Sequence, residues 1–182
     1  MLLCVDVHYG ESRAVVGCVG FADWAAPASS LELVVRSEKP PEAYEPGKLY
    51  LREMPYILGA VAQIERLGQI ELLIVDAHAW LDEDRPGLGA HLHAALDGRC
   101  PVIGVAKSPF RGSSALPVLR GDSRSPLFVS AAGMDAGLAA ERVAAMHGEH
   151  RVPTLIRRAD QLARGLALPD AEKTPADFSL RK

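Results

Sequence analysis

The sequence predicts an α/β fold in which helices flank a mixed β-sheet. Two observations lead to this prediction: β-branched, apolar runs open the chain, and helix-like and strand-like runs then alternate along it. The chain has 182 residues, 48% of them hydrophobic, which suffices for one sizeable core. We expect a single domain over 1–165 and a loosely ordered tail over 166–182, where apolar periodicity is lost.

The first three expected strands form an antiparallel meander. Residues 2–7 (LLCVDV) and 14–21 (AVVGCVGF) are apolar runs on either side of the turn-prone segment 10–13, a pattern typical of a hairpin. Residues 31–38 (LELVVRSE) alternate between apolar and polar side chains and add the third strand. The proline-rich segment 39–47 can continue neither a strand nor a helix, so we expect an exposed loop there.

Helices and strands alternate in the rest of the chain. Apolar residues spaced three and four apart predict an amphipathic helix from Leu49 to about Leu67. The continuous apolar run 70–78 (IELLIVDAH) predicts a central strand that is covered on both faces. The other expected elements are a helix at 87–97, a strand at 101–107, short apolar segments at 115–119 and 126–132, a helix at about 136–147 and a short helix at 159–165.

This order of elements is typical of a ribonuclease-H-like core, in which a three-strand antiparallel meander is followed by parallel strands. Such a core places the first and fourth strands side by side. Each carries an acid, Asp6 within the first strand and Asp76 at the end of the fourth. A charge inside an apolar strand is costly unless it is paired or binds a metal, so Asp6 is a candidate ligand. Asp76 is either a ligand at a strand end or a helix cap.

Bulk properties exclude few kinds of function. No apolar run reaches the roughly 18 residues that a membrane span needs, and we expect a cytoplasmic monomer. The net charge of −3 indicates no global field for a polyanion. Cys4, Cys18 and Cys100 lie in apolar segments without metal-type spacing and are expected to be reduced core residues. A solvated basic face or a phosphate track would account equally well for Arg99, Lys107, Arg111, Arg120, Arg124, Arg151, Arg157, Arg158 and Arg164.

Six segments of the chain carry motifs that occur together in one family. They are VDVHY at 5–9, YEPGKLYLRE at 44–53, LLIVDAH at 72–78, GLGAHL at 87–92, PVIGVAKSPF at 101–110 and RVPTLIRRAD at 151–160. In this order and spacing they resemble the endonuclease V family, and the resemblance covers nearly the whole chain from Val5 to Arg164. The strings Y-x-P-G-x-L-x-x-R-E and I-G-V-A-K are the most specific of them.

The resemblance implies an endonuclease that uses Mg²⁺ or Mn²⁺ and hydrolyses a phosphodiester on the 3′ side of a deaminated base, inosine, in DNA or RNA. It implies that Asp6, Glu53 and Asp76 bind the metal and that Lys107 stabilises phosphate charge. Without the resemblance, Glu53 and Arg52 would be an ordinary solvated pair on a helix, and Lys107 a solvated lysine at a strand end.

The resemblance also implies a surface that binds nucleic acid. Tyr44, with the rigid Pro46 and Gly47 after it, resembles the family's wedge, an aromatic side chain that fills the gap left when a base flips out. Arg85 matches an arginine expected on the same surface. The positions that wall the family's base pocket, which could equally belong to the core, are matched by Leu49, Gly87, Leu88 and Phe110.

Three positions depart from the family. Asp82 stands where the family has a histidine after the strand-end acid, and Met134 replaces a second histidine. Both changes remove groups that would orient water or contact the site. Glu45 places an acid beside the wedge, where it would weaken the attraction for phosphate. Two alternatives therefore stay open: an inosine-binding or nucleic-acid-binding homologue with weak or no cleavage, and a nuclease for structured or single-stranded nucleic acid.

Overall fold

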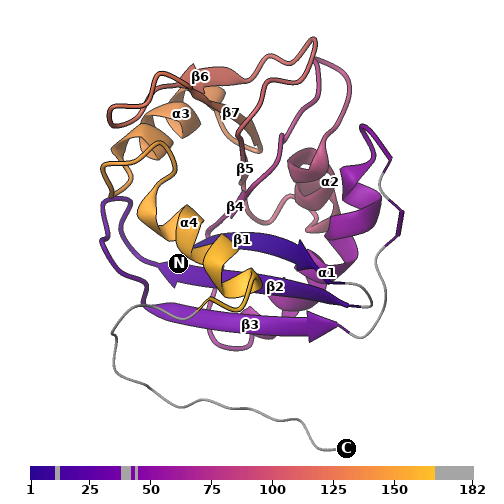
Figure 1. Cartoon of the computed structure of the whole chain (residues 1–182). Helices are drawn as coiled ribbons and strands as arrows, with labels where there is room; N and C mark the ends of the chain where they lie inside the picture. The colour runs from indigo at the N-terminus through magenta and orange to yellow at the C-terminus, as the bar shows by residue number, and fades with distance from the viewer. Residues whose placement is uncertain (11–12, 38–41, 44, 167–182) are drawn as a thin grey trace, which may run out of the picture.

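The computed structural model describes residues 1–10, 13–37, 42–43 and 45–166 of the chain. Its strands form one seven-stranded sheet in the order β3-β2-β1-β4-β5-β7-β6 (Figure 1). The strands are β1 (Leu2–Tyr9), β2 (Ala14–Phe21), β3 (Leu31–Ser37), β4 (Leu72–Val75), β5 (Val102–Ala106), β6 (Leu116–Val118) and β7 (Leu127–Ala132). The helices are α1 (Leu49–Ile64), α2 (Leu88–Ala95), α3 (Ala136–Ala145) and α4 (Thr154–Ala163). The expected tail, apart from Leu166, lies outside the described residues.

The strand order confirms the expected ribonuclease-H-like sheet. β2 pairs antiparallel with both β1 and β3, and β4 and β5 continue the sheet parallel to β1. β7 and β6 then extend it with antiparallel pairing. The first and fourth strands are neighbours, as predicted, and their ladder ends at the pair Val5–Val75. Asp6 and Asp76 are the residues that follow this last pair, so both lie at the same end of the ladder.

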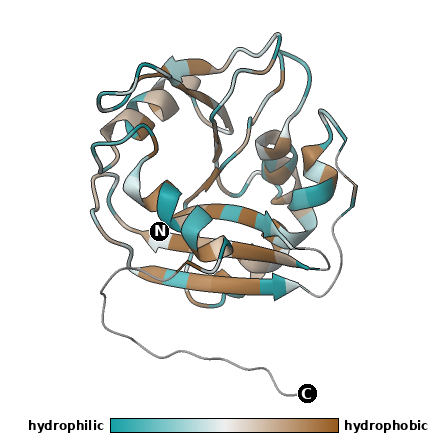
Figure 2. Ribbon diagram, viewed as in Figure 1, coloured by the Kyte–Doolittle hydropathy of each residue, from teal (hydrophilic) through white to brown (hydrophobic). Residues whose placement is uncertain are grey.

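Helices cover both faces of the sheet and enclose two hydrophobic cores. α1 and α2 pack on one face around residues such as Leu3, Ile57 and Leu92, and α3 and α4 pack on the other around Ile74 and Ile156. Figure 1 shows the two helix pairs on opposite sides of the strands, and Figure 2 shows hydrophobic residues concentrated along the strands. The three cysteines are buried and free, as predicted. No helix in the described residues is both long and apolar enough to span a membrane.

Strand β4 is shorter than predicted because the chain turns across β5 directly after it. The expected strand covered 70–78, but the observed strand ends at Val75. A Cβ atom added to Gly104 of β5 would collide with the amide nitrogen of Ala79 and would lie 2.5 Å from the carbonyl oxygen of Ala77. The segment after β4 therefore rests directly on the backbone of β5, which accounts for the glycine of the I-G-V-A-K motif.

The last helix begins earlier than predicted. The apolar pattern predicted a short helix at 159–165, whereas α4 starts at Thr154. Pro153 immediately precedes the first turn, where its fixed φ favours a helix start. Leu155 and Ile156 are buried against the sheet and anchor this first turn. A proline and two apolar residues thus supplied a start signal that the prediction did not use.

Helix α4 lies against β2 without an intervening side chain. A Cβ atom added to Gly17 of β2 would collide with the carbonyl oxygen of Ala159 and would lie 2.6 Å from the amide nitrogen of Ala163. Gly17 is paired with Asp6 in the β1–β2 ladder. The helix therefore comes closest to the sheet beside this acid, and only glycine permits the approach.

Three of the arginines expected on a solvated face or a phosphate track are instead bonded to the protein. Arg120 is 6% exposed and donates to four main-chain carbonyl groups at and after the end of α3. Arg158 is buried and pairs with Glu32 of β3. Arg151 donates to two carbonyl groups near β5 and β7. The broad phosphate track is therefore wrong for these three cations.

Replacing Glu32 with glutamine is expected to destabilise the fold by about 1 kcal/mol at neutral pH. Arg158 donates from Nε to Oε1 of Glu32 at 2.8 Å and from Nη2 to Oε2 at 2.7 Å, and these bonds lower the pKa of Glu32. A carboxyl group with a lowered folded-state pKa stabilises the fold above its unfolded pKa and loses this contribution as the pH falls through the folded value.

Urea unfolding of Glu32→Gln and the wild type at neutral and strongly acidic pH measures this difference. It should disappear in acid, where the wild-type carboxyl is protonated as well. Glu83→Gln, at an exposed position, serves as the control and should unfold like the wild type at both pH values. A difference for Glu32→Gln that is as large in acid as at neutral pH would contradict the assignment.

Candidate active site

Asp6 and Asp76 form the centre of the candidate site. Both follow the last pair of the β1–β4 ladder, Val5–Val75. The backbone N–H of Val7 donates to Oδ1 of Asp6 at 2.7 Å and holds this carboxylate where the β1–β4 ladder ends. Burial, and after it the charge of Asp76, raises the pKa of Asp6 to about 7. The sheet therefore holds two acids close enough to oppose each other's ionisation.

Helix α1 brings Glu53 to the same acids from one face of the sheet. Burial, and after it the charge of Asp6, raises the pKa of Glu53 to about 8. The neighbouring Arg52 lies over the ring of Tyr9, with its guanidinium carbon 4.1 Å from the ring centroid. Glu53 is half-buried and acts on the strand acids, so it is not the freely solvated partner of Arg52 that the sequence left open. The three predicted acids form one electrostatic cluster.

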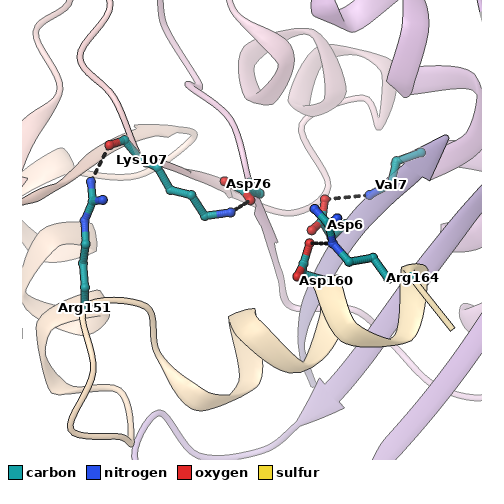
Figure 3. Close-up of polar contacts among 7 residues, drawn as sticks. All are labelled: Asp6, Val7, Asp76, Lys107, Arg151, Asp160 and Arg164. Atoms are coloured by element: carbon teal, nitrogen blue, oxygen red, sulfur yellow. Dashed lines mark hydrogen bonds and ion pairs between the residues drawn. The ribbon is translucent and has the colours of Figure 1, made fainter. Parts of the chain in front are cut away.

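Lys107 lies against Asp76. It directly follows β5, and its Nζ donates to Oδ2 of Asp76, as Figure 3 shows. Burial opposes the charge of Lys107, but the bond to Asp76 and the negative charges of Asp76, Asp6 and Asp160 together outweigh it and raise the pKa of the lysine. The cap of α2 is Gly87, and no helix in the described part of the chain is capped by Asp76. The helix-cap interpretation of Asp76 is therefore wrong.

Helix α4 adds a fourth acid, Asp160, which the sequence analysis did not single out. After burial and Asp76, the charge of Asp160 also raises the pKa of Asp6. Arg164, one turn further along the helix, donates from Nε to Oδ1 of Asp160 at 2.7 Å. Figure 3 shows the carboxylates of Asp160 and Asp6 close together beside Arg164. Asp160 lies at the end of the R-V-P-T-L-I-R-R-A-D segment, and this position was the available signal. Because the helix was predicted to start only at residue 159, Asp160 was not assigned to the site.

The donor chemistry of this cluster fits a hard divalent cation. Mg²⁺ and Mn²⁺ prefer oxygen ligands, and Asp6, Glu53 and Asp76 supply carboxylates from three separate elements. Burial, and after it the charge of neighbouring acids, raises the pKa of Asp6 and of Glu53, and a bound cation would favour the charged form of both. In their present arrangement, no three acidic, histidine or cysteine side chains of the described residues are grouped to hold an ion. Two cations pair with acids of the site: Lys107 pairs with Asp76, and Arg164 pairs with Asp160.

A cavity of about 160 Å³ is lined in part by Ala77 and His78, the two residues that follow Asp76 in the chain. Its wall includes five of the residues that were predicted to bind nucleic acid: Gly47, Leu49, Gly87, Leu88 and Phe110. The prediction missed the rest of the wall, which consists of Tyr50, Ala77, His78 and Leu81. His78 contacts Phe110 edge to face, with ring centroids 6.3 Å apart, and its Nε2 donates to the carbonyl of Ser108 at 2.9 Å. A larger open hollow of about 740 Å³ at the ends of α1 and α2 contains none of the predicted site residues.

The remaining predicted contacts lie around this cavity or outside the described residues. The guanidinium carbon of Arg85 lies 5.7 Å from the ring centroid of Phe110. A Cβ atom added to Gly47, whose φ is +78°, would lie 3.2 Å from the same carbon. Arg85 thus stands at the cavity mouth. Pro46 is exposed and is not part of the cavity wall. Tyr44, the predicted wedge, lies outside the described residues.

Asp82 and Met134, which stand in place of histidines, have local structural roles. Oδ1 of Asp82 accepts the backbone N–H groups of Asp84 at 3.1 Å and Arg85 at 2.7 Å, so it shapes the loop that carries Arg85. Met134 packs on the core beneath α3. The acid of Glu45 is paired with Lys48 at 2.7 Å. These three departures therefore contribute to loop geometry and packing.

The fold and the site together define a class of protein. A ribonuclease-H-like sheet with two acids where the pairing of its central strands β1 and β4 ends, near a cavity, is the arrangement of a phosphodiester-cleaving nuclease. The model of the endonuclease V family matches residues 1–133. Endonuclease V of Streptomyces coelicolor is 34% identical to this chain, and the match covers 92% of this chain and 78% of the relative. The chain belongs to the endonuclease V family.

Solved structures agree with this assignment. The crystal structure of endonuclease V from Streptomyces avermitilis is 31% identical, has a TM-score of 0.72, and the match covers 90% of this chain and 79% of that one. Endonuclease V of Ciona intestinalis, crystallised with a 24mer DNA containing an inosine followed by a ribo-adenosine, has a TM-score of 0.76 at 18% identity. That match covers 90% of this chain and 84% of the other, and it confirms the fold.

Proposed function

We propose that this chain is a metal-dependent endonuclease that hydrolyses a phosphodiester bond on the 3′ side of a deaminated base, inosine, in DNA or RNA. The observation that carries the proposal is the placement of Asp6 and Asp76 at one end of a single strand pair, beside a cavity large enough for one base. Family membership and the inosine-containing complex of a structural relative support the substrate. We also propose that the chain acts in the cytoplasm as a monomer.

The acids are proposed to hold the metal. Asp6, Glu53 and Asp76 would bind Mg²⁺ or Mn²⁺, which when bound neutralises phosphate charge and lowers the pKa of water. Lys107 would add a compact positive charge beside the phosphate, because its ammonium already lies at the acid cluster. Asp76 would thus carry both the contact with Lys107 and a share of the metal binding.

The cavity is proposed to receive the flipped base. Leu49, Leu88 and Phe110 give it an apolar wall against which a planar base can pack. A Cβ atom added to Gly87 would lie 2.5 Å from the carbonyl oxygen of His78, so the absence of a side chain lets two backbone segments meet there. Exposed main-chain groups of such segments can read the edge of inosine, whose ring N–H is a donor where adenosine has an acceptor.

The test is cleavage of a labelled strand that contains one inosine. With Mn²⁺, the chain is expected to cut this strand on the 3′ side of the inosine at least about 100-fold faster than a matched strand with adenosine, because the pocket rejects the wrong hydrogen-bonding edge. Chelation with EDTA should stop the reaction and added Mn²⁺ should restore it. Equal cutting of both strands would contradict the inosine preference, and cutting in EDTA would contradict the metal requirement.

A second candidate function is binding of inosine-containing nucleic acid without cleavage. The observation that favours it is Asp82, whose carboxylate holds the backbone N–H groups of its own loop and therefore does not replace the proton donor that a histidine would supply. In this case the chain would bind the inosine strand more tightly than the adenosine strand in a fluorescence anisotropy titration and would leave both intact with Mn²⁺. Any inosine-dependent nicking excludes this alternative.

A further inference from the structure

Arg151 links the end of β5 to the start of β7. Its Nη2 donates to the main-chain carbonyl oxygen of Lys107 and, at 2.6 Å, to that of Pro126. Figure 3 shows the guanidinium reaching the backbone of Lys107, while the ammonium of the same lysine extends away toward Asp76. One arginine therefore holds the backbone of the residue whose side chain lies at the acid cluster.

The two carbonyl groups lie where strand pairing ends. The last pair of the β5–β7 ladder is Ala106–Phe128, so Lys107 and Pro126 lie just beyond it. Proline has no N–H group, and Pro126 cannot donate a further ladder bond. Arg151 supplies the donor that the strand lacks, and it joins both carbonyls through one rigid, planar group.

The surroundings of Arg151 differ from those of a phosphate ligand. Arg151 is partly buried, its Nη2 is occupied by the two carbonyls, and its buried Nε has no acceptor among the described residues. Arg157, six residues later, is exposed, and its side chain forms no hydrogen bond or ion pair within the described chain. The two arginines carry the same charge, but only Arg151 is built into the strand end.

We propose that Arg151 is a positioning residue that acts through Lys107. By holding the carbonyl group of Lys107, it fixes where the lysine leaves the sheet and so directs the ammonium onto the acid cluster. The side chain of Lys107 is 48% exposed, so its flexible stem receives little restraint from packing. This inference rests on the proposed function, because the position of the Lys107 ammonium affects the rate of cleavage only if a phosphodiester is cleaved at these acids.

The experiment is a double-mutant cycle on cleavage of the inosine strand under single-turnover conditions. Arg151→Met is expected to lower kcat by about 10- to 100-fold and to change KM by less than about twofold, because a reacting group is displaced while the substrate surface is kept. Arg151→Lys should recover only part of the rate, since the flexible ammonium lacks the planar group that holds Nη2 between the two carbonyls. Arg157→Met removes the same charge and serves as the matched control.

The decisive comparison is the effect of Arg151→Met in a chain that already carries Lys107→Met. If Arg151 acts through Lys107, the second substitution should lower the rate by less than about twofold. Full additivity of the two losses would overturn the inference and leave Arg151 a structural residue. If Arg151→Met fails to fold, the same cycle is run with Arg151→Lys. Absence of cleavage by the wild type would overturn the proposed function and this inference together, whereas wild-type cleavage with additive losses would overturn the inference alone.

Discussion

Replacing Asp76 with asparagine is expected to lower the rate of inosine-dependent cleavage by about 10³-fold or more. The amide keeps the shape of the side chain but removes the negative charge that acts on Asp6 and binds Lys107. A neutral amide is also a weaker ligand for a hard divalent cation than a carboxylate. Single-turnover cleavage at saturating Mn²⁺ measures the loss. Calorimetric titration with Mn²⁺ should show binding weakened by at least about tenfold.

Asp122→Asn provides the matched control for this experiment. Asp122 is exposed and has no hydrogen bond or ion pair in the described part of the chain, so its variant should cleave at the wild-type rate. Thermal unfolding establishes that both variants are folded at the assay temperature. Nicking by Asp76→Asn at the wild-type rate would remove Asp76 from the site, and it would leave the cavity without an adjoining reactive centre.

Replacing Arg120 with methionine is expected to destabilise the fold by about 3–5 kcal/mol, the largest effect on stability that we anticipate. The guanidinium of Arg120 donates from Nη1 to the carbonyl of His150 at 3.0 Å and from Nη2 to that of Gly148 at 3.1 Å, and it also donates to the carbonyls of Ala144 and Met146. Methionine fills a similar volume but leaves these acceptors without their donor. The chain after α3 would lose its attachment to β6.

Urea unfolding followed by circular dichroism measures this loss. Arg120→Lys should recover less than half of it, because one ammonium group cannot reach carbonyls on several sides. Arg124→Met is the control: Arg124 is exposed, and its loss should change the stability by no more than about 0.5 kcal/mol. An unfolding midpoint for Arg120→Met equal to that of the wild type would show that water replaces the guanidinium at no cost.

The sheet could be predicted from the sequence because its first strands are apolar runs separated by polar, turn-prone segments. The runs at 2–7, 14–21 and 31–38 became β1, β2 and β3 with small changes in their ends. Local patterns failed where a contact distant in sequence decides the boundary. β4 ends early because the chain after it crosses Gly104, and periodicity within 70–78 contains no trace of that crossing.

The same distinction applies to the site. Asp6 could be suspected from the sequence because it interrupts an apolar strand, and Asp76 because it ends one. Glu53 required the family resemblance, since a helical acid beside Arg52 is ordinary by itself. Asp160 and Arg151 lie in the family-like segment 151–160, but its local pattern does not say which of its polar residues reach the site. Only the packing of α4 on β1 and β2, and the strand end at Lys107, give these two residues their places.

The absence of a side chain at Gly17 sets the distance between α4 and the sheet at the site. Because α4 rests on bare backbone opposite Asp6, the gap between an acid of the sheet and Asp160 of the helix is set by the thickness of two main chains. That thickness is set by van der Waals contact between main-chain atoms, which substitutions on the outer side of the helix leave unchanged. A residue larger than glycine at position 17 would push the helix away from the sheet and increase the separation of the two carboxylates.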